Sequence, residues 1–264
     1  MDAFERLLAT SQASIDEVLD NLRIREEFTS LFIARSRELY AYSEHKNYPG
    51  LTDQLQRAMS RRGASPDAAF RGLYVEINGT FERGIKSISE AVVASIQSRY
   101  RRYSEIDEAF RNRHSVHSAK VLAKLNDGEI NGLKYDFSQL QRNLGLCFTD
   151  HSPISLNSDI FTVFIGNCTP NRLEDLFETI GVPPPFDDEL GKHAAVKRWS
   201  GNKGAREAAK SAREALERQL ELRNNIVHGP IGGQRIEASD IERASELTSA
   251  LLSAFAEKAR TAVG

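Results

Sequence analysis

Apolar residues recur every three or four positions between residues 65 and 96, and this spacing constrains the fold more than any other feature. Ser65 is a good N-cap residue, and Pro66 suits the first turn of a helix. The stripe that follows consists of Phe70, Leu73, Ile77, Phe81, Ile85, Ile88, Val92 and Ile96. One helix face this apolar must be covered by other elements. The pattern therefore predicts a long core helix over 65–96.

A first long helix is expected before this segment. Its apolar residues are Ile15, Val18, Leu22, Leu31, Leu39 and Tyr42, which follow a largely helical period. The pattern ends near the sequence HKNYPG, which contains a Pro-Gly turn signal. A short helix over Leu51–Arg61 is expected next, and the glycine and proline of RRGASPD separate it from the core helix.

Two strong helices are predicted at the end of the chain. One covers residues 205–227, and the other begins at the sequence SDIE, where Ser239 and Glu242 have the spacing of a capping box. The stripe of the last helix is Ile241, Ala244, Leu247, Leu251, Phe255 and Ala259. A shorter helix is expected between Thr169-Pro170, which can start it, and Gly181, which can end it.

The segment from Leu125 to Pro185 gives the weakest signals. NDGEINGLKYD is expected to be a loop, DIFTVFIGN is open to a short strand or a helix, and VPPPFDDELG is expected to be a stiff extended linker. Helix still dominates the pattern as a whole. The predicted fold class is therefore all-α, a helical bundle with one less regular insertion.

Composition limits the classes of function. The chain has 264 residues, enough for a full core, and a formal net charge of -2, so contact with nucleic acid would depend on a local basic patch. Its two cysteines, Cys147 and Cys168, lack metal-site spacing, which favours a reducing, cytoplasmic location. The acidic, amphipathic N-terminus does not resemble a signal peptide, and no apolar segment has membrane-spanning length. No membrane partner is expected.

A candidate site lies in the sequence LELRNNIVHGP, at the end of the helix expected over 205–227. Leu216, Leu220, Arg223 and Val227 are spaced four, three and four residues apart. Arg223 therefore lies on an apolar stripe that should face another helix, where a guanidinium is costly unless an anion meets it. His228 lies about 140° further around an ideal helix. The two side chains can converge only at the helix end.

Two interpretations of this sequence are open. An arginine that binds phosphate, together with a histidine that titrates near neutral pH, can cleave a phosphodiester without a metal. Asn224 shares a helix face with His228, so its amide could orient the imidazole or a substrate group. In the structural alternative, Arg223 caps the last carbonyl groups and His228 interacts with the negative helix end. Spacing alone favours this alternative.

The sequence RNNIVHG, near the end of a long helix and before a final amphipathic helix, resembles the signature of HEPN domains. That signature is an arginine and a histidine separated by four to six residues, with a polar residue after the arginine. Arg223, Asn224 and His228 match it. The earlier sequence LYVEINGTFERGIKSI resembles the first core helix of the RiboL-PSP type, in which an acidic residue follows an aromatic one, as in Phe81-Glu82.

The resemblance implies an all-α HEPN-like bundle over 65–264, with residues 1–64 as an additional N-terminal helical extension. It implies a metal-independent endoribonuclease in which Arg223, Asn224 and His228 are catalytic and the product is a 2′,3′-cyclic phosphate. Such proteins act as homodimers, often in toxin–antitoxin or antiphage systems, so RNA and an antitoxin or other regulatory protein are the expected partners. No cofactor and no metal are expected. Because many members have lost catalysis, an inactive HEPN module that binds RNA, a nucleotide or a protein partner is the alternative.

The same pattern occurs a second time in RNRHSVH, where Arg111 and Asn112 precede His117. This match ranks lower, because SAKVLAKL continues the helix and no glycine ends it. His114 and His117 have the spacing of two metal ligands, but no third ligand can be assigned. Exposed histidines in a basic helix explain this pair equally well.

The segment around this second match is basic and contains aromatic residues. The predicted RNA-binding residues are Arg99, Arg101, Arg102, Arg111, Arg113 and His117, with Tyr100 and Tyr103 between the arginines. A strip of this kind can hold an RNA backbone and stack bases. A solvated charged helix face is the alternative for each of these residues.

Overall fold

The structure, a computed structural model, describes residues 2–45, 50, 53–54, 65–125, 129–130, 133–134, 136–163, 166–229 and 235–264. The α-helices are α1 (Ala3–His45), α3 (Ser65–Arg99), α4 (Glu108–Lys124), α5 (Phe137–Phe148), α6 (Pro170–Thr179), α7 (Asp188–Lys192), α8 (Ala194–Trp199), α9 (Ala205–His228) and α10 (Ala238–Val263). Two short 3-10 helices, η1 (Tyr103–Glu105) and η2 (Asp159–Phe161), and an antiparallel pair of two-residue strands, β1 (Glu129–Ile130) and β2 (Leu133–Lys134), complete the described elements. The predicted all-α class is confirmed.

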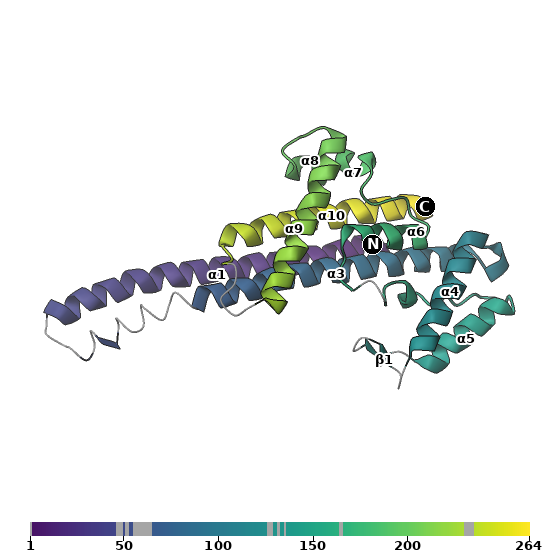
Figure 1. Cartoon of the computed structure of the whole chain (residues 1–264), viewed down its shortest axis with the longest axis horizontal. Helices are drawn as coiled ribbons and strands as arrows, with labels where there is room; N and C mark the ends of the chain where they lie inside the picture. The colour runs from purple at the N-terminus through teal and green to yellow at the C-terminus, as the bar shows by residue number, and fades with distance from the viewer. Residues whose placement is uncertain are drawn as a thin grey trace.

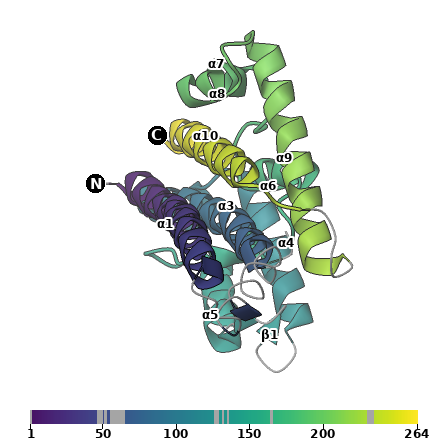
Figure 2. The ribbon, with the colours of Figure 1, turned by 90° about the vertical axis from the view of Figure 1, so that its left-hand side faces the viewer.

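Helices α1, α3 and α10 lie side by side and form the body of the molecule (Figure 1). Seen along their length they form a tight group, and α9 passes beside them (Figure 2). Helix α1 is antiparallel to α10, because Arg260 Nε near the end of α10 lies 3.4 Å from the Asp2 carboxylate. Further along, Ser249 Oγ donates a hydrogen bond to Gln12 Oε1 over 2.9 Å. The first half of α1 is therefore part of the same bundle as α3 and α10.

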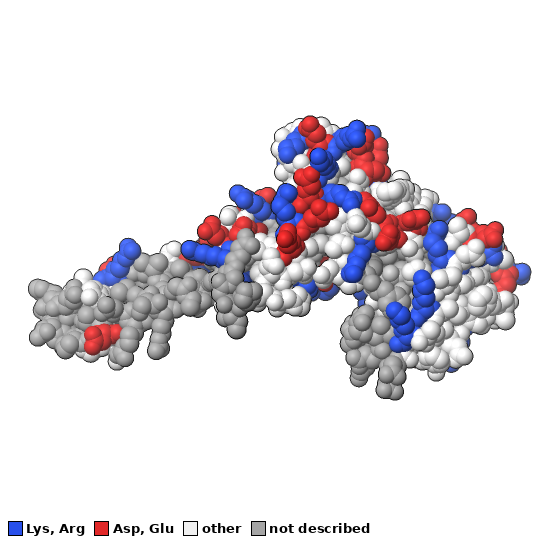
Figure 3. Space-filling model, viewed as in Figure 1, with Lys and Arg blue, Asp and Glu red and all other residues white. Residues whose placement is uncertain are grey.

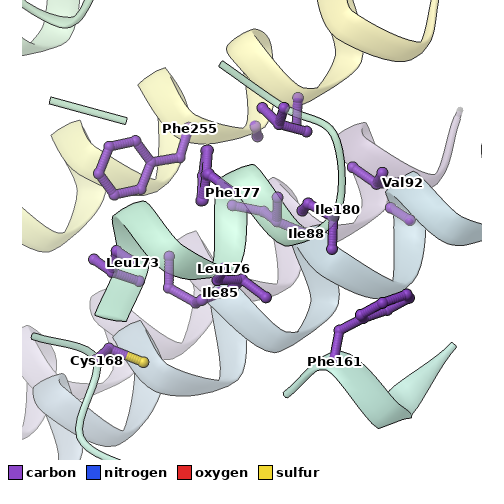
Figure 4. Packing of buried hydrophobic residues seen from close by; sticks show 14 of the residues in the cluster. Ile85, Ile88, Val92, Phe161, Cys168, Leu173, Leu176, Phe177, Ile180 and Phe255 are labelled. Atoms are coloured by element: carbon purple, nitrogen blue, oxygen red, sulfur yellow. The ribbon is translucent and has the colours of Figure 1, made fainter. Parts of the chain in front are cut away.

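The stripe predicted at 65–96 forms the centre of the core. Its residues Ile77, Phe81, Ile85, Ile88 and Val92 are fully buried. Helix α6 packs on this face, and Phe177 meets Phe255 of α10 edge to face, with 5.3 Å between ring centroids (Figure 4). Each fully buried side chain of this size contributes about 1.5–3 kcal/mol through removal of apolar surface from water. The predicted core helix is confirmed and holds α6 and α10 in place.

Helix α1 is buried over only part of its length. The stripe predicted a long helix ending near residue 45, and this is confirmed. Ile15, Val18 and Leu22 are buried against α3 and α10. Leu31 and Tyr42 further along are 65% and 54% exposed, because the second half of α1 extends beyond the body (Figure 1). The short helix expected over 51–61 lies largely outside the described residues.

Helix α9 begins where α7 approaches it most closely. Gly191 of α7 lies directly against the first residue of α9, because a Cβ atom added to Gly191 would lie 1.7 Å from the carbonyl oxygen of Ala205. Small side chains at Ala208 and Ala212 are fully buried on the following turns. The next buried residues, Leu216 and Leu220, carry the apolar face towards α3. This packing directs the C-terminal end of α9 across α3.

A buried histidine organises the far end of α3, where α4 and α5 pack. The backbone N–H of Asn157 donates to His114 Nε2 over 3.1 Å, so the neutral imidazole carries its proton on Nδ1. That Nδ1 lies 3.1 Å from the Tyr103 hydroxyl, which in turn donates to the carbonyl oxygen of Arg111 over 2.8 Å. Burial, with a smaller contribution from His117, lowers the pKa of His114 to about 4. The alternative in which His114 is an exposed histidine of a basic helix is therefore wrong.

Helix α5 was not expected from the sequence. Asp136 caps it by accepting a hydrogen bond from the backbone N–H of Gln139 over 2.9 Å. Its buried face consists of Leu140, Asn143 and Cys147. The polar asparagine interrupts the apolar stripe, which is why the period is weak. Asn143 is satisfied in the core by donating to Asn157 Oδ1 over 3.0 Å.

Three local expectations are corrected. Within NDGEINGLKYD, residues 129–130 and 133–134 form the β1–β2 pair. The linker VPPPFDDELG is not extended throughout, since Asp187 caps α7 by accepting from the Leu190 N–H over 3.2 Å. Helix α10 begins earlier than expected, because Asp240 accepts from the Glu237 N–H over 3.0 Å in place of the predicted Ser239 box. Within DIFTVFIGN, which was open to a strand or a helix, residues 159–161 form the 3-10 helix η2, and 162–163 form a turn. None of the helices in the described parts of the chain could cross a membrane.

Candidate functional site

The predicted motif occupies the last turns of α9. The helix ends at His228, and the N–H of Gly229 donates to the carbonyl oxygen of Asn225 over 2.9 Å. A Cβ atom at Gly229 would lie 2.2 Å from that same oxygen. Any larger residue would therefore shift the backbone at the helix end. The glycine that ends the helix in the sequence therefore has a steric basis at Gly229.

Arg223 is directed into the bundle and meets an acidic residue of α3. Its Nη2 lies 3.9 Å from Glu82 Oε1, and the two side chains are 21% and 29% exposed. This is the anion that the sequence required for a guanidinium on the apolar stripe. Glu82 follows Phe81, the fully buried aromatic of the core helix, so the register of α3 places the carboxylate at the rim of the core. The pair joins residues 141 positions apart.

An asparagine from the loop before α6 completes the cluster. Arg223 Nη1 donates to Asn167 Oδ1 over 3.2 Å and to Asn224 Oδ1 over 3.1 Å. Asn167 Nδ2 also donates to Asn224 Oδ1 over 3.1 Å. Three elements therefore hold the guanidinium: α3, the loop before α6, and α9 itself. Hydrogen bonds from two sides restrict the orientation of the arginine fork.

The electrostatics of the cluster leave Glu82 poorly compensated. Burial raises the pKa of this carboxyl group, and nearby Arg223 and Arg83 lower it by less. Its Oε1 atom is buried and accepts no hydrogen bond from the described residues. At 3.9 Å, Arg223 Nη2 is too far away to donate one. The pair therefore has a loose geometry in which the guanidinium could turn towards a stronger anion such as phosphate.

His228 stands apart from this cluster. It is exposed, whereas Arg223 is half-buried, as expected for residues about 140° apart on a helix. Val227 beside it is 47% exposed, so the predicted apolar stripe is buried only as far as Leu220. Within the described residues no hydrogen bond joins His228 to Arg223 or to Asn224. The side-chain oxygen of Asn224 is directed towards Arg223 instead, which differs from its expected role of orienting the imidazole.

In the second match of the motif, the arginine and the histidine are half-buried and pack within the fold. Arg111 is half-buried and its carbonyl oxygen accepts from Tyr103, while Asn112 is exposed. His117 packs on Phe161, with 5.6 Å between ring centroids. Burial, followed by the charge of Lys120, lowers the pKa of His117.

The residues of the predicted basic strip lie in different environments, and some of them form hydrogen bonds within the fold. Arg99 Nη2 donates to the carbonyl oxygen of Gly264 over 2.9 Å, and Arg113 Nε donates to that of Thr179 at the end of α6 over 2.8 Å. Tyr103 is buried and cannot stack on a base. Arg101 and Arg102 are exposed.

Away from this strip, over α7–α9, Figure 3 shows Lys and Arg interspersed with Asp and Glu, so the charge on that face is mixed.

Two residues of the cluster region, Asn167 and Arg172, were not predicted from the sequence to belong to the site. Arg172, in the first turns of α6, donates through Nη1 to the carbonyl oxygen of Asn167 over 3.4 Å. The only local signal is a glycine before the asparagine and the Thr-Pro start of α6. Nothing in such a loop indicates that its amide reaches an arginine 56 positions later.

An all-α bundle with an arginine, a polar residue and a histidine at the end of its penultimate long helix has the features of a HEPN domain. A family model described as RiboL-PSP-HEPN matches residues 42–260, which is most of the chain. The chain therefore belongs to the RiboL-PSP-HEPN family. No curated protein and no solved structure matched it.

Proposed function

We propose that this protein is an endoribonuclease of the HEPN type that cleaves RNA without a metal. The arrangement that supports the proposal is Arg223, half-buried and held by Glu82 and Asn167, on the same helix end as an exposed His228. A guanidinium with this loose ion pair can bind phosphate, and an exposed imidazole can transfer protons. Membership of the RiboL-PSP-HEPN family supports the proposal.

In the proposed reaction, the ribose 2′-oxygen attacks the neighbouring phosphorus as its hydroxyl proton is removed. The bond from phosphorus to the 5′-oxygen of the next nucleotide breaks, and that oxygen takes up a proton. His228 acts as the base or the acid, and Arg223 stabilises the charge of the pentacovalent phosphate. Asn224 and Asn167 orient Arg223. The products are a 2′,3′-cyclic phosphate and a free 5′-hydroxyl end.

The exposed position of His228 adds a requirement for a second chain. Arg223 points inward to Glu82, so one helix end presents the two groups to a single phosphate poorly. We propose a two-fold homodimer in which the α9 ends of both chains line one cleft. The cluster formed by one chain then faces a histidine of the other.

Incubation of the purified protein with labelled RNA in excess EDTA tests the proposal. Cleavage should proceed and yield ends with a cyclic phosphate, detected by mass spectrometry. The matched control is the same oligonucleotide with 2′-deoxyribose throughout, which should stay intact because it lacks the nucleophile. Cleavage of the DNA, or loss of all RNA cleavage in EDTA, would contradict this mechanism.

The alternative is an inactive HEPN module that binds RNA, a nucleotide or a protein. The observation that favours it is the separation of Arg223 from His228 within one chain, together with the engagement of Arg223 by Glu82. This alternative predicts that RNA binds and remains intact in the same assay. It also predicts no toxicity on expression, whereas the nuclease should be toxic in a manner lost with His228→Ala.

A further inference from the structure

The loop before α6 turns sharply at Gly166-Asn167, and its conformation is determined by its neighbours. Gly166 has a φ of +54°, which a residue with a side chain adopts only with strain. Asn167 is followed by the buried Cys168, which anchors the loop beside Ile85 and Leu173 in the core (Figure 4). The Asn167 carbonyl oxygen accepts from the N–H of Thr169 over 2.8 Å. Asn167 is therefore positioned by the turn at Gly166 before it and by the buried Cys168 after it.

This asparagine contacts two arginines from different helices. Its side-chain oxygen accepts from Arg223 of α9 over 3.2 Å, and its carbonyl oxygen accepts from Arg172 of α6 over 3.4 Å. The Arg172 guanidinium lies over Gly166, since a Cβ atom there would be 2.7 Å from Arg172 Nη1. Burial and, to a smaller extent, the nearby Glu82 raise the pKa of the buried Cys168 thiol to about 12, and the charge of Arg172 opposes this rise.

Side-chain contacts connect α6 and the loop before it to α9. Arg213 of α9 binds Glu174 and the side-chain oxygen of Asn171, both in α6. Ten residues later on the same helix, Arg223 binds Asn167. Because α6 and the loop before it are each attached to α9, the backbone that carries Arg172 is held close to the part of α9 that carries Arg223. Groups held on packed helices are positioned more accurately than groups on free loops.

The charges of this cluster favour an anion. Glu82 offsets the charge of Arg223, Arg83 beside them is paired with Glu76 at 2.6 Å, and the Arg172 guanidinium adds positive charge next to Asn167. Arg223 is half-buried, whereas Arg172 is exposed. An RNA strand whose scissile phosphate lies at Arg223 would thus find a second guanidinium on the solvent side of the same asparagine. Arginine is suited to such contacts through its planar fork of donors.

We propose that Arg172 is a second phosphate-binding residue of this site, which holds a backbone phosphate beside the one at Arg223. The inference rests on the proposed function, because it assigns a substrate contact to the same site. Gly166 and Asn167 are positioning residues in this arrangement, since they orient the two arginines. The substrate class that follows is single-stranded RNA, in which neighbouring phosphates are free to reach both guanidinium groups.

The test uses full-length protein carrying His228→Ala, so that RNA stays intact, and a fluorescein-labelled single-stranded RNA of mixed sequence. Fluorescence anisotropy gives the dissociation constant at several salt concentrations. Adding Arg172→Gln should raise the dissociation constant about tenfold, the worth of one hydrogen bond to a charged group. The slope of log affinity against log salt should also fall by about 0.7, because one phosphate contact is lost.

Two control variants distinguish phosphate binding by Arg172 from a purely structural contact with the Asn167 carbonyl group. Arg172→Lys keeps the charge, so it should retain the salt slope while losing part of the affinity. Arg206→Gln removes an exposed arginine in the first turn of α9, at the other end of that helix, and should change neither quantity. If Arg172 only braced the Asn167 carbonyl group, Arg172→Gln would leave the salt slope unchanged, and the inference would be overturned.

Cleavage of RNA by the wild-type chain is measured in parallel. RNA cleavage combined with an unchanged dissociation constant in Arg172→Gln overturns the inference and leaves the proposed function standing. RNA binding that Arg172→Gln weakens, without any wild-type cleavage, supports the inference and contradicts the catalytic proposal. Absence of RNA binding contradicts both.

Discussion

At the scale of single residues, Arg223 illustrates how a charged side chain is accommodated on an apolar helix face. Leu216 and Leu220 bury the preceding turns, and the arginine then reaches Glu82 and Asn167 at the edge of the core. A half-exposed ion pair of this kind contributes about 1 kcal/mol or less to stability. Stability therefore gives little reason for a guanidinium placed between three elements, which agrees with the proposed phosphate contact.

His228→Ala is predicted to lower the rate of RNA cleavage by about two to four orders of magnitude, the usual contribution of a positioned acid or base. The side chain is exposed, so the fold should be unaffected. Single-turnover cleavage and far-ultraviolet circular dichroism measure the two effects. His151→Ala, which removes another exposed histidine, is the control. An unchanged rate in His228→Ala would direct attention to Arg111 and His117.

The buried His114 predicts a pH dependence of stability. Its pKa falls from an ordinary 6.5 to about 4 in the folded protein, so between these values the unfolded chain binds the additional proton. This contribution is complete above pH 6.5 and is lost as the pH falls towards 4. The expected loss is about 1.4 kcal/mol per pH unit. Urea denaturation at pH values across this interval measures it.

The control for this slope is His114→Gln, which cannot gain the proton. The variant should be less stable at neutral pH, because Asn157 and Tyr103 lose well-placed partners, yet its stability should change less between pH 6.5 and 4. His151→Gln should keep the wild-type slope. A His114→Gln slope equal to that of the wild type would assign the acid sensitivity to other groups.

At the scale of elements, the approach of α7 to α9 depends on a missing side chain. Gly191→Ala would bring a Cβ atom to 1.7 Å from the Ala205 carbonyl oxygen, and backbone must move to relieve the clash. We predict a loss of about 1–3 kcal/mol in the free energy of unfolding. Gly72→Ala in α3, where nothing lies within 4 Å of the added atom, is the matched control. That substitution should be neutral or stabilising by about 0.4–1 kcal/mol.

The two glycine variants also test the direction of α9. If α7 sets where α9 starts, Gly191→Ala should reduce RNA cleavage as well as stability, because the shift carries Arg223 away from Glu82. Gly72→Ala should leave cleavage at the wild-type rate. Equal free energies of unfolding for the two variants would show that α7 can move away from α9 without loss of stability.

At the scale of the whole molecule, the separation of Arg223 and His228 predicts complementation between chains. Arg223→Ala and His228→Ala proteins should each be inactive, and mixing them under conditions that exchange subunits should restore part of the cleavage. In the mixed dimer one site receives both intact residues, provided that Arg223 of one chain serves His228 of the other. The rate of RNA cleavage after mixing measures the effect.

Proof of exchange by native mass spectrometry is the control for that experiment. No rescue despite exchange would mean that each site takes both residues from one chain or needs all four. A fully active monomer, detected by analytical ultracentrifugation at micromolar concentration, would refute the dimeric arrangement.

The sequence by itself determined the long helices α1, α3, α9 and α10 and most of their buried faces, together with the family. The stripes of α3, α9 and α10 were legible because helical periodicity is local, with residues three and four apart sharing a face. The helical pattern did not predict burial where polar side chains lie in the core, as at Asn143 of α5 and at His114. There, a hydrogen-bonding partner distant in sequence decides whether a polar side chain is buried.

Only the tertiary structure decided what meets Arg223. The helical pattern placed the arginine on an inward face and required an anion, but the crossing of α9 over α3 chose Glu82, and the turn at Gly166 brought Asn167 and Arg172 to the same point. These contacts join residues far apart in the chain. They depend on how packed helices cross and approach, which no local spacing encodes.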